Sequence, residues 1–187
     1  MTDSAFCRIV RLISQSDPER AGRVDVKSRG DHVALREGSN DLIVFREMVS
    51  SEAIIRGNDK TLGMTEIHKD ERPIVQQIFG SEPEKMAEAA KIIERDHAPE
   101  GFDINMGCPV YKVTHSFNGA SLMKDPERAA EIVRAVKEAV NVPVSVKIRA
   151  GWENPKDCLT FGTVLEGAGA DLITIHGRTK KQGYAEQ

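Results

Sequence analysis

Residues 102–109 read FDINMGCP, a strand-like apolar segment that ends in an amide, a glycine, a thiol and a proline. Gly107 permits a positive φ or a close backbone approach, and Pro109 fixes its own φ and keeps Cys108 out of the helical region. The thiol is therefore expected at a sharp exit from a strand, where active-site groups of α/β folds lie. On this context alone Cys108 can equally be a buried structural cysteine, because free cysteines are among the most buried residues.

A repeating pattern of a short apolar run followed by a helical period surrounds this stretch. Strands are predicted to start at residues 42, 73, 102, 143 and 171, with intervals of 31, 29, 41 and 28 residues. These intervals are typical of consecutive βα units, and such alternation predicts a parallel sheet. The one long interval contains the loop 108–122, which directly follows the strand that leads to Cys108.

Local signals give the bounds of the other elements. Strands are predicted over 42–48, 73–79, 143–149 and 171–176. Helices are predicted over 51–56 and over 156–167. Two further helices are predicted, one from a capping box at 81–84 to about His97 and one that begins after an Asp125-Pro126 cap. At the other end of the chain, residues 4–14 have the apolar stripe of an amphipathic helix, and the polar, glycine-broken segment 15–40 is interpreted as an insertion or a long loop.

Polar residues recur where the predicted strands end. They are Glu47, Gln77, Asn105, Lys147 with Arg149, and His176. A doubly wound sheet and a barrel both fit the spacing, but polar strand ends that converge on one rim favour a partial (β/α)8, or TIM, barrel of about five βα units. The predicted fold class is therefore α/β.

Alternation along the strands groups these polar residues further. Ser145, Lys147 and Arg149 share one face of their strand, and the same logic pairs Asp103 with Asn105 and Thr174 with His176. Gln76 and Gln77 point in opposite directions, and periodicity does not choose between them. Any one of these side chains can be merely solvated or satisfied locally, whereas a set that meets at one rim indicates a site.

The composition excludes several classes of protein. The chain of 187 residues is 40% apolar and 29% charged, which is globular, and its net charge of -3 excludes a uniformly basic protein without excluding a local RNA-binding face. Three scattered cysteines without metal-type spacing indicate free thiols, no metal and a reducing compartment. The sequence contains no apolar run long enough for a membrane helix, so a cytoplasmic protein is expected.

An amide, a lysine, a histidine and a thiol around one barrel mouth suit a bound flavin. Gln can pair with the edge of the flavin ring, Lys can stabilise negative charge on it, and the thiol can act on the substrate. No glycine-rich dinucleotide or phosphate-loop fingerprint in the sequence indicates another cofactor.

The sequence resembles the tRNA-dihydrouridine synthases, and most closely those of the bacterial type. The matching stretches, in the family's order, are TDSAF (2–6), EMVS (47–50), VQQIFG (75–80), DINMGCP (103–109), GASLM (119–123), VKIRAG (146–151) and IHGRT (175–179). The succession of INMGCP, VKIR and IHGRT is far more specific than any one of these stretches.

This resemblance implies a flavin-binding TIM barrel that reduces the C5=C6 bond of uridine in tRNA with FMN and NADPH. By position, Cys108 resembles the general acid that protonates C5, and Gln77, Lys147 and His176 resemble FMN contacts. Gln77 is favoured over Gln76 because it precedes Gly80 by three residues. Two further residues in matched motifs, Asn105 and Arg178, are expected to support the substrate or the flavin. A thiol that acts as an acid must keep its proton, so Cys108 is not expected to be a nucleophile.

The chain also departs from the family pattern. The first barrel strand, the last two strands and the C-terminal helical tRNA-binding domain are expected to be absent, so residues 1–187 are interpreted as an incomplete catalytic domain. We therefore expect weak or no FMN binding and little activity from the isolated chain, since the phosphate site of a barrel follows its last strands. A flavin oxidoreductase that acts on a free pyrimidine, and a non-catalytic remnant of the synthase, are the alternative interpretations.

Overall fold

The computed structural model describes residues 43–183, which form one parallel sheet with helices along it. The strands are β1 (Val44–Phe45), β2 (Val49–Ser50), β3 (Ile74–Phe79), β4 (Gly101–Met106), β5 (Val144–Arg149) and β6 (Leu172–His176). The helices are α2 (Ser51–Ile55), α3 (Asp59–Gly63), α4 (Pro83–His97), α5 (Tyr111–Thr114), α6 (Pro126–Ala139) and α7 (Asp157–Gly167), with 3-10 turns η1 (Lys69–Glu71) and η2 (Gly119–Lys124). Each long strand from β3 to β5 leads through a helix to the next strand.

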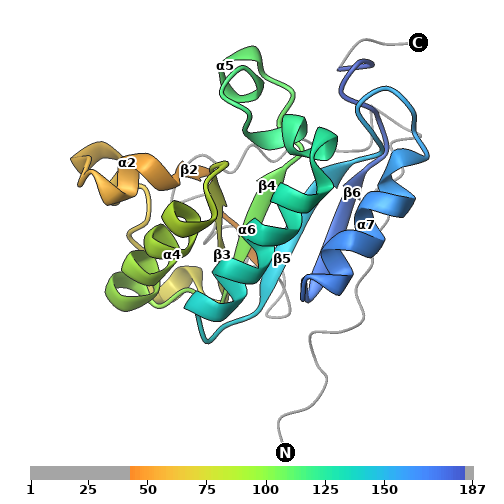
Figure 1. Cartoon of the computed structure of the whole chain (residues 1–187). Coiled ribbons are helices and arrows are strands. Elements are labelled where there is room, and N and C mark those ends of the chain that lie inside the picture. The colour runs from red at the N-terminus through yellow and green to blue at the C-terminus, as the bar shows by residue number, and fades with distance from the viewer. Residues whose placement is uncertain (1–42, 184–187) are drawn as a thin grey trace, which may run out of the picture.

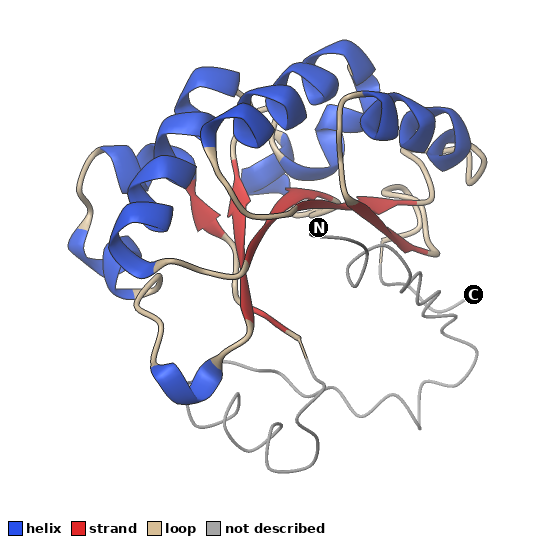
Figure 2. Cartoon of the chain, turned by 90° about the horizontal axis from the view of Figure 1, so that it is seen from below, coloured by secondary structure: helices blue, strands red, loops and turns tan. Residues whose placement is uncertain are grey.

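The sheet is curved, and α4, α6 and α7 cover its convex side (Figures 1 and 2). Its strands follow the order β1-β3-β4-β5-β6, and β2 pairs with the other end of β3. Sequential parallel neighbours joined by helices on one side only are the arrangement of a barrel, because a doubly wound sheet carries helices on both faces. The described residues therefore form a partial TIM barrel, which confirms the predicted fold class.

The core lies between the convex face of the sheet and the helices. Phe102 and Ile104 of β4 and Val146 of β5 are fully buried there, because alternate side chains of a strand point to the same face. The helices contribute matching stripes at helical spacing, including Met86 and Ile93 of α4 and Ile132 and Val136 of α6. The apolar half of each strand is thus used for packing, and the other half faces the concave side.

Ion pairs hold the amino-terminal ends of the strands, a region that we call the amino end. Glu100 accepts hydrogen bonds from Arg72 Nη1 at 2.5 Å and from the backbone N–H of Ile74 at 2.7 Å. Asp171 Oδ2 likewise accepts from Lys137 Nζ and from the backbone N–H of Val144, both at 2.7 Å. Each carboxylate therefore pairs with a cation and also satisfies the first backbone donor of a strand.

Most predicted elements are confirmed within a few residues, and two differ. The strand predicted over 42–48 is divided into β1 and β2: residues 46–48 lie outside both strands, although the Arg46 N–H still donates to the Val75 carbonyl oxygen of β3 at 2.9 Å. The capping box predicted at 81–84 is wrong: the N-cap is Glu82, which makes no side-chain cap bond, and Pro83 begins the helix. Asp125 does cap α6, by accepting from the backbone N–H of Arg128 at 3.0 Å. The predicted helix at 4–14 and loop at 15–40 lie outside the described residues.

Candidate functional site

The ladder registers place the predicted polar residues on one face of the sheet. In one row Gln77 of β3 pairs with Asp103 of β4, which pairs with Ser145 of β5. In the rows above, nearer the carboxyl ends of the strands, the register aligns Asn105 with Lys147 and Thr174, and Arg149 with His176. The predicted sharing of faces within β4, β5 and β6 is confirmed, and this face is the concave one, opposite the helices (Figure 2).

A continuous chain of hydrogen bonds connects this face to the Cys108 turn. Ser145 Oγ donates to Asp103 Oδ1 at 2.5 Å, and Gln77 Nε2 donates to Asp103 Oδ2, also at 2.5 Å. Asn105 Nδ2 in turn donates to Gln77 Oε1 at 2.9 Å. Asn105 Oδ1 then accepts from the backbone N–H groups of Gly107 at 3.1 Å and Cys108 at 2.9 Å. The Asp103 oxygens accept in both of their bonds, which orients the Gln77 amide, and Gln77 in turn orients the Asn105 amide.

Asp103 is the residue at this site whose importance the sequence did not indicate. Its carboxyl is 1% exposed, and burial raises its pKa above the usual range, although the hydrogen bonds from Ser145 and Gln77 and the charge of Lys147 act in the opposite direction. The sequence placed Asp103 beside Asn105 but could not show that it is the acceptor of two side chains. A charged residue in the middle of an apolar strand was the available signal, since such a residue needs buried partners.

Two hydrogen bonds to carbonyl oxygens fix the turn that carries Cys108. Arg149, which is 2% exposed, donates from Nε to the carbonyl oxygen of Gly107 at 2.8 Å. The backbone N–H of Ala120 donates to the carbonyl oxygen of Cys108 at 3.0 Å. Gly119 makes this closure possible: its φ is +60°, and a Cβ there would lie 2.9 Å from the Cys108 carbonyl oxygen. The thiol itself is half-buried and free, as the predicted strand exit implies.

Lys147 lies beside Asn105 on the concave face, and its ammonium has no hydrogen-bond or ion-pair partner among residues 43–183. Burial lowers the pKa of Lys147, and the charge of Arg149 adds to this effect, whereas Asp103 opposes it. A half-buried cation without a partner is an attractive position for an anionic or strongly polar ligand.

His176 and Arg178 lie at the end of β6, next to this lysine. Burial lowers the pKa of His176, as do the neighbouring charges of Arg149, Lys147 and Arg178, so its ring is neutral at pH 7. Nδ1 of that ring accepts the backbone N–H of Arg178 at 3.2 Å, which leaves the proton on Nε2. His176 can therefore serve as a hydrogen-bond donor without carrying a charge.

Two other polar residues from the strand ends do not join this face. Gln76 is fully buried in register with Phe102, and its Nε2 donates to the carbonyl oxygen of Glu47 at 3.1 Å. Glu47 lies in the interruption between β1 and β2, with an exposed side chain. Gln77 thus lies on the concave face and Gln76 does not, while the expectation that Glu47 converges with the others is not met.

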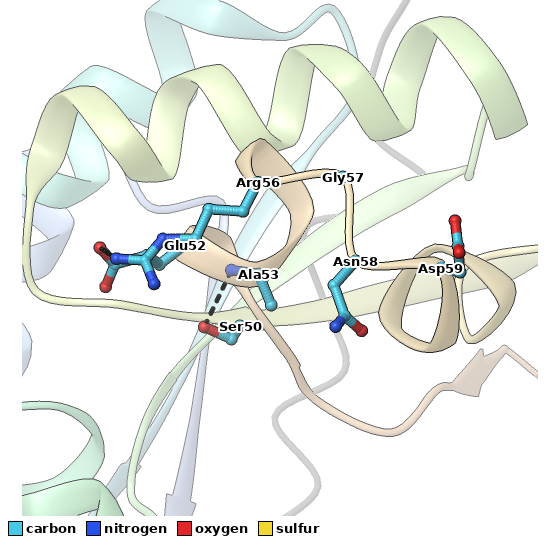
Figure 3. A pocket seen from close by; sticks show the side chains of 7 residues that line it. All are labelled: Ser50, Glu52, Ala53, Arg56, Gly57, Asn58 and Asp59. Carbon is cyan, nitrogen blue, oxygen red and sulfur yellow. Dashed lines mark hydrogen bonds and ion pairs between the residues drawn. The ribbon is translucent and has the colours of Figure 1, made fainter.

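A second hollow on the surface lies outside this face. Its lining consists of residues from the end of β2, from α2 and from the start of α3, namely Ser50, Glu52, Ala53, Arg56, Gly57, Asn58 and Asp59 (Figure 3). Ser50 and Asn58 are N-caps and use their side chains to hold Ala53 and Thr61. None of the predicted site residues lines this hollow.

The side-chain groupings and the helices of the described residues bear on metals and membranes. Within residues 43–183 no three His, Cys, Asp or Glu side chains are grouped so that they could hold a metal ion. No helix in the same range combines the length and the apolar character that crossing a bilayer requires.

Comparison with known proteins gives the class to which this fold and site belong. The family model described as dihydrouridine synthase (Dus) matches residues 2–187, so the chain belongs to the dihydrouridine synthase family. A probable tRNA-dihydrouridine synthase of Rickettsia conorii is 41% identical over 145 residues, which cover 76% of this chain and 44% of the relative.

Two further relatives carry more specific names. The tRNA-dihydrouridine synthase B of Xanthomonas axonopodis is 40% identical over 143 residues, covering 76% of this chain and 43% of that protein. The tRNA-dihydrouridine(16) synthase of Vibrio parahaemolyticus is 41% identical over 133 residues, covering 70% of this chain and 38% of its own. The chain thus spans less than half the length of the curated relatives it matches.

Proposed function

We propose that this chain belongs to the catalytic part of a cytoplasmic tRNA-dihydrouridine synthase, which reduces the C5=C6 bond of a uridine in tRNA with FMN and NADPH. The observation that carries this proposal is the hydrogen-bond chain from Asp103 through Gln77 and Asn105 to the backbone of Cys108, beside Lys147, which has no hydrogen-bond or ion-pair partner within residues 43–183. It fixes a thiol at the edge of a concave, polar face. The names of the relatives support tRNA as the substrate.

The donors on the concave face fit a flavin. Lys147 carries a cation without a hydrogen-bond or ion-pair partner among residues 43–183, His176 carries a neutral N–H, and Gln77 has a second amide proton beyond the one it gives to Asp103. These three residues would hold FMN, and reduced flavin would supply the hydride that adds to C6 of the base. Arg178, whose backbone is bonded to His176, would support the substrate or the flavin.

In this proposal Cys108 donates the proton that completes the reduction. A hydride at C6 leaves negative charge on the uracil, and the thiol proton passes to C5, so the two additions together saturate the bond. Asn105 positions the donor, because its oxygen holds the backbone N–H groups of Gly107 and Cys108. The target base has to leave its stack to reach this turn, which costs a few kcal/mol and favours positions where the RNA is easily opened.

The test is reduction of an unmodified tRNA transcript, with excess FMN and NADPH, by the full-length synthase to which we propose this chain belongs, read as dihydrouridine by mass spectrometry. We expect product from tRNA and none from free uridine. Cys108→Ala should abolish product while the FMN absorbance bound to the protein is retained. Cys158→Ala is the matched control, because Cys158 is the other free cysteine of residues 43–183 and lies on α7. Full turnover by the Cys108→Ala variant would refute the acid role.

A further inference from the structure

Two lysine ammonium groups lie against the ring of Trp152. Lys124 Nζ is 3.6 Å from the ring centroid, and Lys180 Nζ is 4.6 Å from it, within the range of cation–π attraction. Trp152 is the only tryptophan of the chain. We call these three side chains the Trp152 cluster.

The cluster is assembled by the segments that follow three neighbouring strands. Lys124 ends η2, which begins where Ala120 is bonded to the Cys108 carbonyl oxygen, and Trp152 follows β5. Lys180 follows β6, and its backbone N–H donates to the carbonyl oxygen of Gly151 at 2.9 Å. Gly151 cannot carry a side chain here, since a Cβ would lie 1.9 Å from the Asn154 carbonyl oxygen. The cluster is therefore built by the fold on the same rim as Cys108.

The two charges of the cluster have no ion-pair partners in the part of the chain that the structure describes. Neither Lys124 nor Lys180 has a carboxylate partner among residues 43–183, whereas the adjacent Lys181 lies 3.5 Å from Glu153. Two cations beside one ring repel each other, and the ring attracts both without neutralising either. Lys124 is exposed and Lys180 is half-buried, so an anion can reach both. The ligand that such a pair favours is a phosphate or a run of phosphates.

We propose that Lys124 and Lys180, held against Trp152, bind backbone phosphates of the RNA strand that presents its uridine to Cys108. This inference rests on the proposed function and names a surface that contacts the RNA. A base that leaves its stack pulls its flanking phosphates towards the mouth of the site, so cations are needed on the rim rather than inside the concave face. The start of η2 is bonded to the Cys108 turn and its last residue is Lys124, so the cluster lies close to where these flanking phosphates would be.

The single tryptophan provides a direct measurement. Unmodified tRNA transcript is titrated into the chain, without NADPH, and the fluorescence of Trp152 is followed at several salt concentrations. We expect a change in emission on binding, because the two ammonium groups leave or reorient on the ring. Lys124→Gln and Lys180→Gln should each weaken binding several-fold, and each should reduce the slope of log affinity against log salt by about 1. Lys181→Gln is the matched control, and we expect it to retain most of the affinity because Glu153 already holds that charge.

Several outcomes would overturn the inference. An unchanged affinity in the Lys124→Gln, Lys180→Gln double variant, with its unfolding midpoint preserved, would mean that the pair only ties the loops together. Loss of NADPH binding with intact RNA binding would make the cluster a site for the dinucleotide phosphate instead. RNA binding by the chain that depends on both lysines, without any dihydrouridine product from the full-length synthase, would refute the proposed function and leave this inference standing. Product formation together with RNA binding that does not depend on the lysines would support the proposed function and refute this inference.

Discussion

The amino end of the sheet and the rim at its carboxyl end both concentrate charged side chains, but they use them in opposite ways. At the amino end each carboxylate meets a cation and a strand N–H, as Asp171 does with Lys137 and Val144. At the rim Lys147 has no partner among the described residues, and Asp103 is held by neutral donors. Paired charges stabilise a barrel, and unpaired charges that await a ligand cost stability. The difference distinguishes the end of the sheet that stabilises the fold from the end that carries the proposed site.

The largest effect on stability is expected at Arg149, which lies at the rim but stabilises the fold as the paired charges of the amino end do. Arg149 is buried and donates to the carbonyl oxygens of Gly107, Thr179 and Gly183. Arg149→Met would leave these acceptors unpaired, so we expect the free energy of unfolding to fall by about 3 kcal/mol in chemical denaturation. A loss under about 1 kcal/mol would show that this guanidinium belongs to the ligand site rather than to the scaffold.

The second-largest effect is expected at Asp103, where two substitutions separate the loss of its charge from the loss of its hydrogen bonds. Asp103→Ala removes the acceptor for Gln77 and Ser145, and we expect a loss of about 2 kcal/mol together with several-fold faster alkylation of Cys108, measured by mass spectrometry. Asp103→Asn should stay near the wild type in both measurements, because Asn Oδ1 can accept from Gln77 while Ser145 accepts from its amide. Equal alkylation rates in all three proteins would mean that the hydrogen-bond chain does not position the thiol.

A smaller loss is expected at the amino end. Asp171→Ala removes both the ion pair with Lys137 and the acceptor for the Val144 N–H, in a partly exposed setting, so we expect a loss of about 1.5 kcal/mol in the free energy of unfolding. Asp171→Asn keeps the acceptor and removes the charge, and it should lose less. If the two variants were equal, the ion pair rather than the strand N–H would account for the effect.

The smallest effect has the opposite sign. Lys147→Met removes a half-buried cation that has no hydrogen-bond or ion-pair partner in the described part of the chain, and we expect a gain of about 1 kcal/mol in the free energy of unfolding at pH 7, with loss of FMN binding in the full-length synthase. Lys137→Met, which breaks the pair with Asp171, is the matched control and should lose stability. If both variants lost stability, the charges at the two ends of the sheet would not differ in their effect on folding.

The pH dependence of stability in the wild type and in the Lys147→Met variant gives a further check on the same prediction. Because the pKa of Lys147 is lowered in the folded state, the unfolded chain keeps this proton to higher pH than the folded chain does. The free energy of unfolding of the wild type should therefore rise with pH between the lowered pKa and the ordinary value of about 10.4. The stability advantage of Lys147→Met at pH 7 should shrink over this range.

The sequence predicted the faces of the strands well, because alternation is a local property. It grouped Ser145, Lys147 and Arg149 correctly and placed Cys108 at a strand exit. It could not predict partners that lie in different strands: that Asp103 accepts from two neighbours, or that Arg149 is structural rather than part of an open site. Those depend on registers between strands, which no local pattern encodes.

The same limit explains two other differences. The break between β1 and β2 follows from the pairing of each piece with a different end of β3, which the apolar run 42–48 did not reveal. The Trp152 cluster unites residues from three loops, so its members looked unrelated in the sequence. Contacts of this kind become visible only when the parallel strands bring their carboxyl ends together.

The bond between the Ala120 N–H and the Cys108 carbonyl oxygen closes the base of the segment that carries α5. This segment stands out from the body of the protein, and Val110 and Tyr111 are 51% and 74% exposed (Figure 1). Loops of this kind move on nanosecond to microsecond timescales, and motion above a closed base does not displace what lies below it. If Cys108 is the acid that we propose, movement of this segment would admit the nucleotide while the closed base kept the thiol in place, so nucleotide entry and the geometry of proton transfer would be set by separate parts of one loop.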